Sequence, residues 1–263
     1  GTIVDSEFIK MVFRNFKPDK VIHAAASFKD PNAWEEDVNT NIIGSINIVN
    51  ACKKFKVKRL IYFQTGLCYG LAPLELPIEL NHPLFNNNDR KGTSYAISKT
   101  VGEQYINLSD LDFISFRLTN IIGPRNLSGP IPNFYNRLSE GKSVLIADTR
   151  RDFVYVSDLV IVVLKAIEGV GKKGYYHISS GSDYSILEIL KATISAMDYK
   201  KDSQIEIRPM GSDDVQTILL DPSKTEKDFS WKALTPIEVS IKKAVSWYKT
   251  YGVTKSFSHL KLN

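Results

Sequence analysis

Two periods of apolar residues alternate along the first half of the chain. Short, continuous apolar runs predict three buried strands, over residues 20–23, 59–63 and 113–118. Apolar residues at a spacing of three or four predict helices around them, over about residues 5–16, 34–56 and 93–108. Strands and helices that alternate in this way are typical of crossover units, so we expect a parallel sheet.

Beyond Pro124 the predicted elements become shorter and more mixed. Strands are predicted over residues 143–147, 154–156 and 174–178. Residues 186–197 have helical spacing, and residues 235–238 (Thr-Pro-Ile-Glu) have the sequence of a capping box with proline at the first helical position. A last helix should therefore begin there.

These elements predict an α/β protein in two parts. Residues 1–123 should form a parallel-sheet domain, to which later segments return, and residues 124–263 should form mainly a smaller C-terminal lobe. A cleft between two such parts is the expected site for a ligand.

The composition is that of an ordinary globular protein, with 263 residues of which 43% are hydrophobic and 24% charged. Disordered and collagen-like chains are thereby excluded. The net charge of +5 is small and dispersed, and its densest cluster, over residues 53–59, is typical of a solvated helix end. Nucleic-acid binding is not expected, because the required basic residues interleaved with exposed aromatic residues are missing.

Location and metal content can also be predicted from the sequence. No apolar run reaches the roughly 18 residues that a membrane helix requires, and the first residues do not resemble a secretory signal. Cys52 and Cys68 lie in apolar segments and match no metal-ligand spacing. Two lone thiols suit a reducing compartment better than a disulfide framework. We therefore expect a cytoplasmic protein that binds neither a membrane nor a metal ion.

A tyrosine and a lysine four positions apart give the first chemical signal. Tyr95 and Lys99 fall on the same face of a predicted helix. A nearby cation favours the phenolate and lowers the pKa of a phenol, so that the tyrosine can act as a general base. Such pairs are common on exposed helices, and the spacing by itself is a weak signal.

The surroundings of this pair make it more informative. Thr65 follows a predicted strand thirty positions before Tyr95, and Ala24–Ala26 follow another strand with small side chains that leave room for a cofactor. In a parallel sheet these strand ends line the ligand crevice. Two further motifs stand downstream: Arg117-Leu118-Thr119-Asn120 followed by Gly123-Pro124-Arg125, and Arg151-Asp152-Phe153-Val154-Tyr155.

Together, these segments resemble the extended short-chain dehydrogenase/reductase superfamily, and within it the nucleotide-sugar epimerase/dehydratase branch. The resemblance covers essentially the whole chain. The segments at 64–70 (Gln-Thr-Gly-Leu-Cys-Tyr-Gly) and 150–154 (Arg-Arg-Asp-Phe-Val) are most similar to O-antigen nucleotide-sugar epimerases. This resemblance implies a Rossmann-like doubly wound parallel sheet with a smaller C-terminal α/β substrate lobe, NAD as cofactor and a UDP-sugar as substrate.

The resemblance also assigns roles to single residues. Thr65 and Tyr95 match the catalytic hydroxyl and phenol, and Lys99 matches the lysine that binds the nicotinamide ribose and lowers the tyrosine pKa. The implied cofactor-binding positions are Ile3, Ala24, Ala25, Ala26, Lys29, Asn41, Thr65, Tyr95, Lys99 and Thr119. The implied substrate-binding positions are Thr65, Tyr95, Asn120, Arg151, Arg208 and Asp214.

Two of these residues also have plainer interpretations. Asn41 could be a polar side chain that is satisfied in the middle of its helix. Arg151 suits a phosphate because its planar fork binds two oxygens, but it could instead form a surface ion pair with Asp152. The sequence leaves both alternatives open.

The first strand of the family and its glycine-rich phosphate loop have no counterpart in this sequence. That loop brings the backbone close to the cofactor pyrophosphate at a helix N-terminus. Residues 1–5 (Gly-Thr-Ile-Val-Asp) instead resemble a family segment that follows the third strand and touches the adenine. We therefore expect that about sixty residues, two crossover units, are absent from this numbering. The residue that separates NAD from NADP would lie among them.

The residues after Thr65 narrow the expected reaction. Related 4,6-dehydratases have an Asp-Glu pair there and nucleotide-sugar decarboxylases a glutamate two places on, whereas this chain has Gly66 and Leu67, which cannot transfer a proton. Thr65, Tyr95 and Lys99 suffice for reversible oxidation of a sugar hydroxyl, which predicts epimerisation at C4 through a 4-keto sugar. An NAD(P)H-dependent reductase or dehydratase, and a non-catalytic cofactor-binding protein, stay open as alternatives.

A homodimer is the last expectation from the sequence. In the family, the helix with the Tyr95 position and the long helix around residues 41–54 pair with their copies in a four-helix interface about a two-fold axis. Ile48 is expected to point away from the stripe of Ile42, Ile46 and Val49, which favours a second buried surface. Burial of the excess by the chain's own loops is the alternative.

Overall fold

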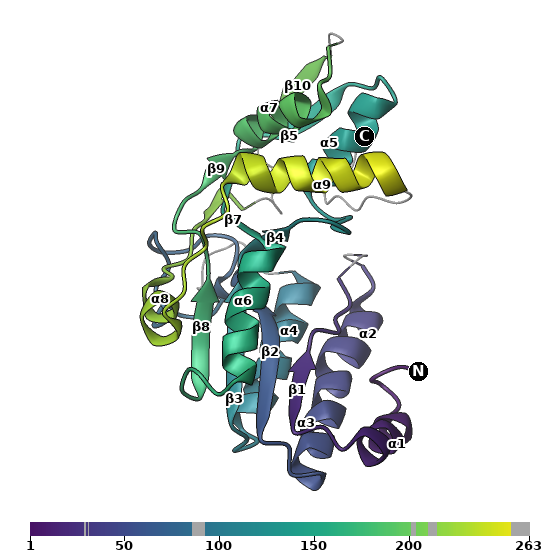
Figure 1. Cartoon of the computed structure of the whole chain (residues 1–263), viewed down its shortest axis with the longest axis vertical. Helices are drawn as coiled ribbons and strands as arrows, with labels where there is room; N and C mark the ends of the chain where they lie inside the picture. The colour runs from purple at the N-terminus through teal and green to yellow at the C-terminus, as the bar shows by residue number, and fades with distance from the viewer. Residues whose placement is uncertain (29, 31, 86–92, 201–203, 210–214, 254–263) are drawn as a thin grey trace.

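A four-stranded parallel sheet forms the centre of the larger part of the molecule (Figure 1). The computed structural model describes residues 1–28, 30, 32–85, 93–200, 204–209 and 215–253. The strands stand in the order β1 (Lys20–His23), β2 (Arg59–Thr65), β3 (Phe113–Leu118) and β8 (Gly174–Ile178). All neighbours in this sheet are parallel, so the predicted fold class is confirmed.

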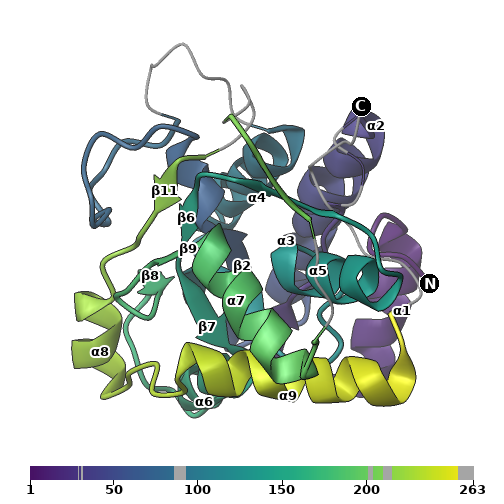
Figure 2. The same ribbon diagram turned by 90° about the horizontal axis from the view of Figure 1, so that it is seen from above.

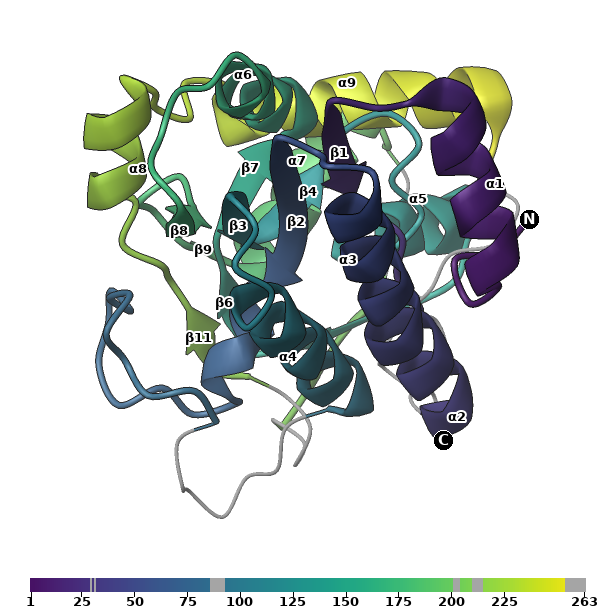
Figure 3. The same ribbon diagram turned by 90° about the horizontal axis from the view of Figure 1, so that it is seen from below.

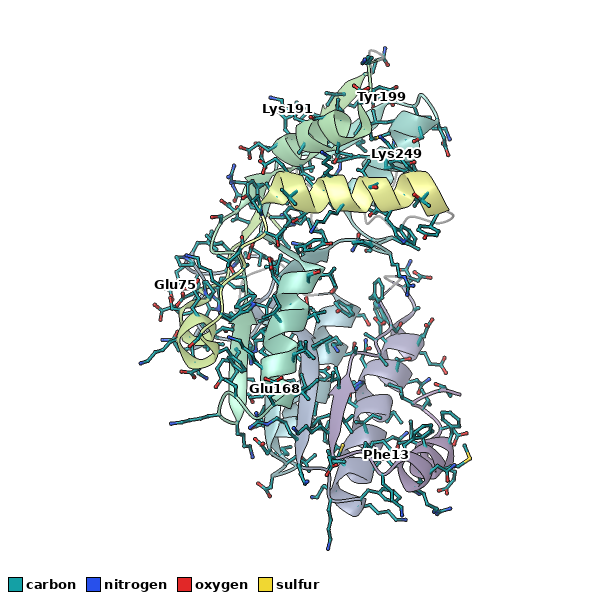
Figure 4. All side chains as sticks on the ribbon, viewed as in Figure 1. Phe13, Glu75, Glu168, Lys191, Tyr199 and Lys249 are labelled. Carbon is teal, nitrogen blue, oxygen red and sulfur yellow. The ribbon has the colours of Figure 1, made fainter. Side chains whose placement is uncertain are left out.

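Helices cover both faces of the sheet. They are α1 (Ser6–Phe16), α3 (Gly44–Lys54), α4 (Ser94–Asn107), α6 (Val156–Ile167) and α8 (Ser223–Phe229). Figure 3 shows α3 and α4 on one face and α6 on the other. The side chains of β2 alternate accordingly, because Leu60 and Tyr62 pack in the core with α1 and α3 and Ile61 packs with α6. Phe13 of α1, labelled in Figure 4, packs in the core that contains Leu60 and Tyr62.

A smaller part of the molecule lies beyond the carboxyl ends of these strands (Figures 1 and 2). Its main elements are α5 (Pro130–Ser139), β5 (Val144–Ala147), α7 (Ile186–Met197), β10 (Ile205–Arg208) and α9 (Ile237–Tyr251). β10 pairs with β5 in parallel, and the three helices share an apolar core that includes Phe134, Leu190 and Tyr248.

Short strands connect the two parts. β4 (Asn120–Ile122) pairs with β7 (Phe153–Tyr155). β6 (Arg150–Arg151) lies between β9 (Tyr184–Ser185) and β11 (Thr217–Ile218). The motifs around Asn120 and Arg151 are therefore placed where the two parts of the molecule meet.

The stretch predicted as one helix over residues 34–56 is divided into three elements. α2 (Trp34–Asp37) and α3 flank a π-helical segment, η1 (Val38–Ile43). Asn41 lies in this wider turn, and its backbone oxygen accepts a hydrogen bond from Ser45 Oγ at 2.7 Å. Segments of π-helix are rare and occur frequently at functional sites. Hydrophobic spacing could not reveal the segment, because it assumes 3.6 residues per turn.

Two local predictions are wrong. The capping box at residues 235–238 does not form, because the Thr235 hydroxyl and N–H bind the Asp158 carboxylate (3.1 and 3.0 Å) and α9 begins only at Ile237. Ile48 does not contribute to a second buried surface between subunits, because it is buried in the chain's own core together with Ile9 and Val49. In both cases a distant part of the chain supplies the partner.

The described residues give no sign of a membrane span or a metal centre. In this part of the chain no helix is long and apolar enough to cross a membrane, and no three His, Cys, Asp or Glu side chains are grouped as metal ligands. Cys52 and Cys68 are buried and free. Burial raises the pKa of the Cys52 thiol to about 12, so this side chain behaves as a protonated, apolar group.

Candidate active site

Tyr95 stands in the first turn of α4, next to a cavity. The helix begins because Thr93 accepts a hydrogen bond from the Ala96 N–H on its Oγ1 (3.1 Å), the usual N-cap arrangement. The Tyr95 ring meets the Phe28 ring edge-on, with 6.3 Å between the centroids. Both rings line a cavity of about 470 Å³, which also has Asn120 and Arg151 in its wall. Three of the predicted substrate ligands therefore share one cavity.

Lys99 lies one helical turn further along α4 and is only 2% exposed. Its Nζ is 4.0 Å from the centroid of the Tyr62 ring, and the Tyr62 hydroxyl donates to the Lys99 backbone oxygen at 3.0 Å. Burial lowers the pKa of Lys99 to about 7, against the opposing effect of Glu103. Lys99 is therefore only partly charged near neutral pH.

The lowering of the Tyr95 pKa by Lys99 stays a prediction, since other groups set this pKa in the structure. Burial, followed by the Asp37 carboxylate, raises the pKa of the Tyr95 phenol to about 12. Burial is the larger of the two causes and the carboxylate adds to it, while the Lys99 Nζ rests over the Tyr62 ring. Spacing along the helix could not reveal that carboxylate.

Thr65 is the last residue of β2, in register with Leu118 of β3, so its hydroxyl stands at the carboxyl end of the sheet as predicted. Its Oγ1 accepts a hydrogen bond from the Leu67 N–H at 3.2 Å and caps the short turn η2 (Gly66–Tyr69). Gly66 is buried, and a Cβ at this position would lie 3.2 Å from the Leu118 backbone oxygen. The turn therefore offers little room for an acidic side chain at position 66.

Asn41 joins the loop after β1 to α4. Its Oδ1 accepts from the Ser27 N–H (2.9 Å), and its Nδ2 donates to the Ser27 oxygen and to Ser98 Oγ, both at 3.0 Å. A Cβ on Gly102 would come within 2.5 Å of the Asn41 backbone oxygen, so glycine is needed where the two helices cross. Asn41 is thus not satisfied within its own helix, and this alternative is excluded.

The other predicted cofactor residues lie near the loop and at the N-terminus. Ala24 and Ala25, directly after β1, are exposed. The side chain of Ile3 packs against Gly44 of α3, and its backbone oxygen accepts from Asn47 Nδ2 at 3.0 Å. Lys29 lies outside the described residues.

The backbone oxygen of Asp152 organises the end of β3. It accepts hydrogen bonds from Thr119 Oγ1 (2.8 Å) and Asn120 Nδ2 (3.0 Å). The Asp152 carboxylate is fully buried and accepts from the N–H (3.1 Å) and the hydroxyl (2.5 Å) of Ser180. Asp152 is therefore engaged with Ser180, and the interpretation of Arg151 as its surface partner is excluded.

Arg151 is held by backbone oxygens. Its Nη1 donates to Arg150 at 2.7 Å and to Val215 at 2.5 Å, which fixes the guanidinium at the cavity wall. Arg208 stands opposite Ala147 in the β5–β10 pair, and it is not among the residues that line the cavity. Asp214 lies outside the described residues.

Sequence reasoning missed two residues at this site, Phe28 and Asp37. Phe28 stands in the loop that Asn41 holds, two residues beyond the alanine run. Asp37 lies one π-helical turn before Asn41 and is 1% exposed. Both enter the site through the tertiary packing of α2 and its loop against α4, which no spacing pattern encodes.

A comparison with protein families places this geometry in a known context. Residues 1–179 match the family described as "NAD dependent epimerase/dehydratase family". The chain belongs to this family. The predicted family is thereby confirmed, and NAD, the predicted cofactor, is the one that the family description names.

Curated relatives include both classes of enzyme in the family's name. The chain is 28% identical over 265 residues to the dTDP-D-glucose 4,6-dehydratase of Bos taurus, with 95% of this chain and 73% of the relative covered. It is 26% identical over 286 residues to the UDP-glucose 4-epimerase of Lacticaseibacillus casei, with 95% and 83% covered. Whole-chain similarity therefore does not choose between elimination and epimerisation.

Two solved structures from Bordetella bronchiseptica are more similar. The enzyme WbmH in complex with NAD⁺ is 46% identical, with a TM-score of 0.90 over 96% of this chain and 82% of that chain. The enzyme WbmG in complex with NAD and UDP is 40% identical, with a TM-score of 0.89 over 100% of this chain and 83% of that chain.

Proposed function

We propose that this protein is an NAD-dependent epimerase that inverts C4 of a UDP-linked sugar, in the cytoplasm, for the synthesis of a surface polysaccharide such as O-antigen. The observation that supports the proposal is the shared cavity, which is lined by Tyr95 and by the phosphate-binding candidates Asn120 and Arg151. Its volume of about 470 Å³ falls in the range of small-molecule sites. The similar enzyme WbmG binds NAD and UDP, which supports this choice of ligands.

The residues at the carboxyl end of β1 and on α4 fit the cofactor. The exposed methyl groups of Ala24 and Ala25 leave space beside the strand, as the close approach of a dinucleotide requires. Asn41 positions that loop through Ser27, and Lys99 offers an amino group that is partly protonated near neutral pH. When bound there, NAD would supply the acceptor and donor for the hydride of the sugar C4.

The side chains of the protein handle the proton in this reaction. Tyr95, as phenolate, takes the proton of the C4 hydroxyl and returns it after the sugar has turned. Thr65, at the adjacent strand end, orients that hydroxyl. Gly66 and Leu67 offer no acid or base, and the tight surroundings of Gly66 favour epimerisation over elimination of water.

Anchoring by the nucleotide suits this reaction. The keto sugar must rotate freely while it remains captive, so its binding energy must come from the UDP part. Arg151 and Asn120 line the cavity, and Arg208 and Asp214 are the further candidates that the family resemblance implies. The guanidinium of Arg151 is already fixed by backbone oxygens, so its orientation need not be established when the diphosphate binds.

Turnover assays on UDP-sugars test the proposal. Incubation with a UDP-hexose deuterated at C4 should give the C4 epimer with the deuterium retained and no added coenzyme consumed. Transfer of the deuterium to added NADP⁺, with net formation of reduced coenzyme and a 4-keto sugar, would identify a reductase running in reverse, and loss of water would identify a dehydratase. Absence of turnover despite tight binding of NAD would favour a non-catalytic protein.

We also propose that the chain forms a homodimer through α4 and the long helix beside it. Large apolar side chains are exposed along both: Trp34, Val38 and Ile43 on α2 and η1, Ile97 and Tyr105 on α4, and Leu108 directly after α4. The two helices pack side by side, so these residues can contribute to one continuous surface. Sedimentation should give a dimer at micromolar concentration, and a monomer would contradict the proposal.

A further inference from the structure

Gln64, directly before Thr65, has a buried side-chain amide of which only the oxygen is used. The residue is 2% exposed, and its Oε1 accepts a hydrogen bond from the Thr65 N–H at 2.8 Å. Its Nε2 is enclosed and has no hydrogen-bond partner among the described residues. A backbone N–H can only donate, so the amide oxygen must face Thr65 and the amide nitrogen is the atom left unpaired.

The end of β2 has a paired strand on one side only. β1 is in register with β2 up to the pair of His23 and Tyr62, whereas β3 continues beside β2 as far as Thr65. The N–H of Thr65 is accepted by the Gln64 side chain. Gln64 therefore completes the hydrogen bonding of the last residue of β2, at a point where the pairing with β1 has ended.

The amide of Gln64 is poorly explained by stability. Its register partner on β3 is Arg117, whose guanidinium only donates and is paired with Glu103 at 2.9 Å, so this neighbour offers the Gln64 nitrogen no acceptor. A buried donor without a partner lowers stability, and an apolar side chain of similar length would avoid this loss. The only side-chain hydrogen bond that Gln64 makes within the described residues is the one with Thr65.

This hydrogen bond is one of two that fix Thr65. Gln64 Oε1 holds the Thr65 N–H, and the Thr65 Oγ1 accepts from the Leu67 N–H at 3.2 Å. Thr65 is extended, with φ −104° and ψ 147°, and the turn η2 follows directly. In the proposed reaction the Thr65 hydroxyl orients the C4 hydroxyl of the sugar, and a misplacement of about 1 Å can lower a rate about 100-fold. The placement of the Thr65 backbone therefore matters for turnover.

We infer that Gln64 is a positioning residue of the active site, whose carboxamide oxygen fixes the last peptide of β2 and, through it, the Thr65 hydroxyl. The inference rests on the proposed function for the role of Thr65 in turnover. The contact between Gln64 and Thr65 does not depend on that function, so it can be tested separately.

Amide hydrogen exchange tests the contact without reference to activity. Gln64→Met keeps the length of the side chain and removes the acceptor, so the Thr65 N–H should exchange about 5- to 10-fold faster, the factor expected for one lost hydrogen bond. Gln64→Glu keeps an oxygen at this place, in a carboxyl that burial holds in its protonated form, and should retain the slow exchange. Thr193→Val is the control, because it removes a buried hydrogen bond of α7, to the Ile189 oxygen at 2.7 Å, and should leave the Thr65 exchange unchanged.

Steady-state kinetics in two backgrounds test the role in turnover. Gln64→Met should lower kcat by about 10- to 100-fold and leave KM within about twofold, because the proposed nucleotide contacts lie elsewhere. In the Thr65→Val background the same change should lower kcat no further, since Gln64 acts only through the Thr65 hydroxyl. Gln64→Glu should restore most of kcat, and Thr193→Val should not alter it.

Thermal unfolding separates the inference from a purely structural role. The melting temperature of Gln64→Met should not fall, because removal of the unpaired nitrogen offsets the loss of the hydrogen bond. A lower melting temperature with unchanged kcat, or an equal fall of kcat in both backgrounds, would overturn the inference. Faster Thr65 exchange in a Gln64→Met protein whose parent turns over no UDP-sugar would retain the positioning of Thr65 by Gln64 and reject only the proposed function.

Discussion

The first half of α4, with Tyr95 and Lys99, and its second half, with Glu103, differ in how their polar side chains are paired. In the second half, the Glu103 carboxylate accepts hydrogen bonds from Arg117 Nη2 (2.9 Å) and Ser115 Oγ (2.5 Å). In the first half, the ammonium of Lys99 has only the ring of Tyr62 and no ion pair with a described residue, and the Tyr95 hydroxyl donates to no described acceptor. Lys99 and Glu103 are both buried, so burial alone does not explain the difference between them.

The paired half continues as an ordered chain of donors and acceptors. Arg117 Nη1 donates to the Tyr69 hydroxyl at 2.7 Å, and that hydroxyl lies 2.6 Å from His177 Nε2. His177 Nδ1 lies 2.9 Å from the backbone oxygen of Asp221, which can only accept, so Nε2 must be the acceptor from Tyr69. Burial lowers the pKa of His177 to about 4, which keeps the ring neutral.

The contrast separates structural polar groups from functional ones. A network in which every member has a partner holds β3, β8 and α4 in a single arrangement. Groups that lack partners in an otherwise well-packed protein are available to a ligand. On this criterion we propose the first half of α4 as the reaction site and the second half as its support.

Removal of the Tyr95 hydroxyl should have the largest effect. Tyr95→Phe should lower kcat by about 10³-fold or more, because general acid–base catalysis contributes about 10²–10⁴-fold and no other described side chain replaces it. Stability should be unchanged, since this hydroxyl makes no hydrogen bond with a described residue. Thr65→Val should be less severe, because its hydroxyl orients the substrate and does not ionise.

Steady-state kinetics and thermal unfolding of the same preparations would check this prediction. Activity of Tyr95→Phe within threefold of the unmodified protein would remove Tyr95 from the mechanism. A marked loss of stability would show that the first half of α4 is as structural as the second, and the contrast would no longer hold.

A substitution that removes the ion pair in the second half of α4 should lower the stability of the protein and hardly change ligand binding. Glu103→Gln leaves Arg117 buried without its counter-charge, which should lower the free energy of unfolding by about 3–5 kcal/mol. Urea denaturation measures this, and Glu140→Gln, which removes the exposed partner of Lys142, is the matched control and should cause no measurable change. Equal effects of the two variants would refute the structural role of the network.

The sequence predicted the parts of this contrast that depend on local pattern. The parallel strands and the helix with Tyr95 and Lys99 on one face follow from periodicity and spacing. The partner of Glu103 does not, because Arg117 reaches it from a strand, and neither does the position of Asp37, which depends on how α2 packs on α4. The burial that raises the pKa of Tyr95 could not be predicted either, because it depends on tertiary packing.

Anchoring of the diphosphate should show an intermediate effect. Arg151→Met removes the fork of a residue that lines the cavity and should weaken the affinity for UDP by about 10- to 100-fold, because charge-assisted hydrogen bonds contribute roughly 1.5–3 kcal/mol. Arg150→Met is the control, because Arg150 pairs with Asp183 and does not line the cavity. Calorimetric titration of UDP distinguishes them, and equal affinities would place the phosphate site elsewhere.

The charge of Lys99 should give the smallest effect, a dependence of stability on pH. Its pKa is lowered to about 7 in the folded protein, against about 10.4 for an unperturbed lysine, so between these values the unfolded chain binds more protons than the folded one. Stability should therefore rise with pH above 7, by at most about 1.4 kcal/mol per pH unit from this group.

Lys99→Met keeps the length of the side chain and removes the charge. The difference in unfolding free energy between the unmodified protein and this variant should change by about 1–2 kcal/mol between pH 7 and 8.5. If the unfolding free energies of the two proteins change equally with pH, Glu103 already compensates the charge of Lys99 in the folded state. Both halves of α4 would then be paired.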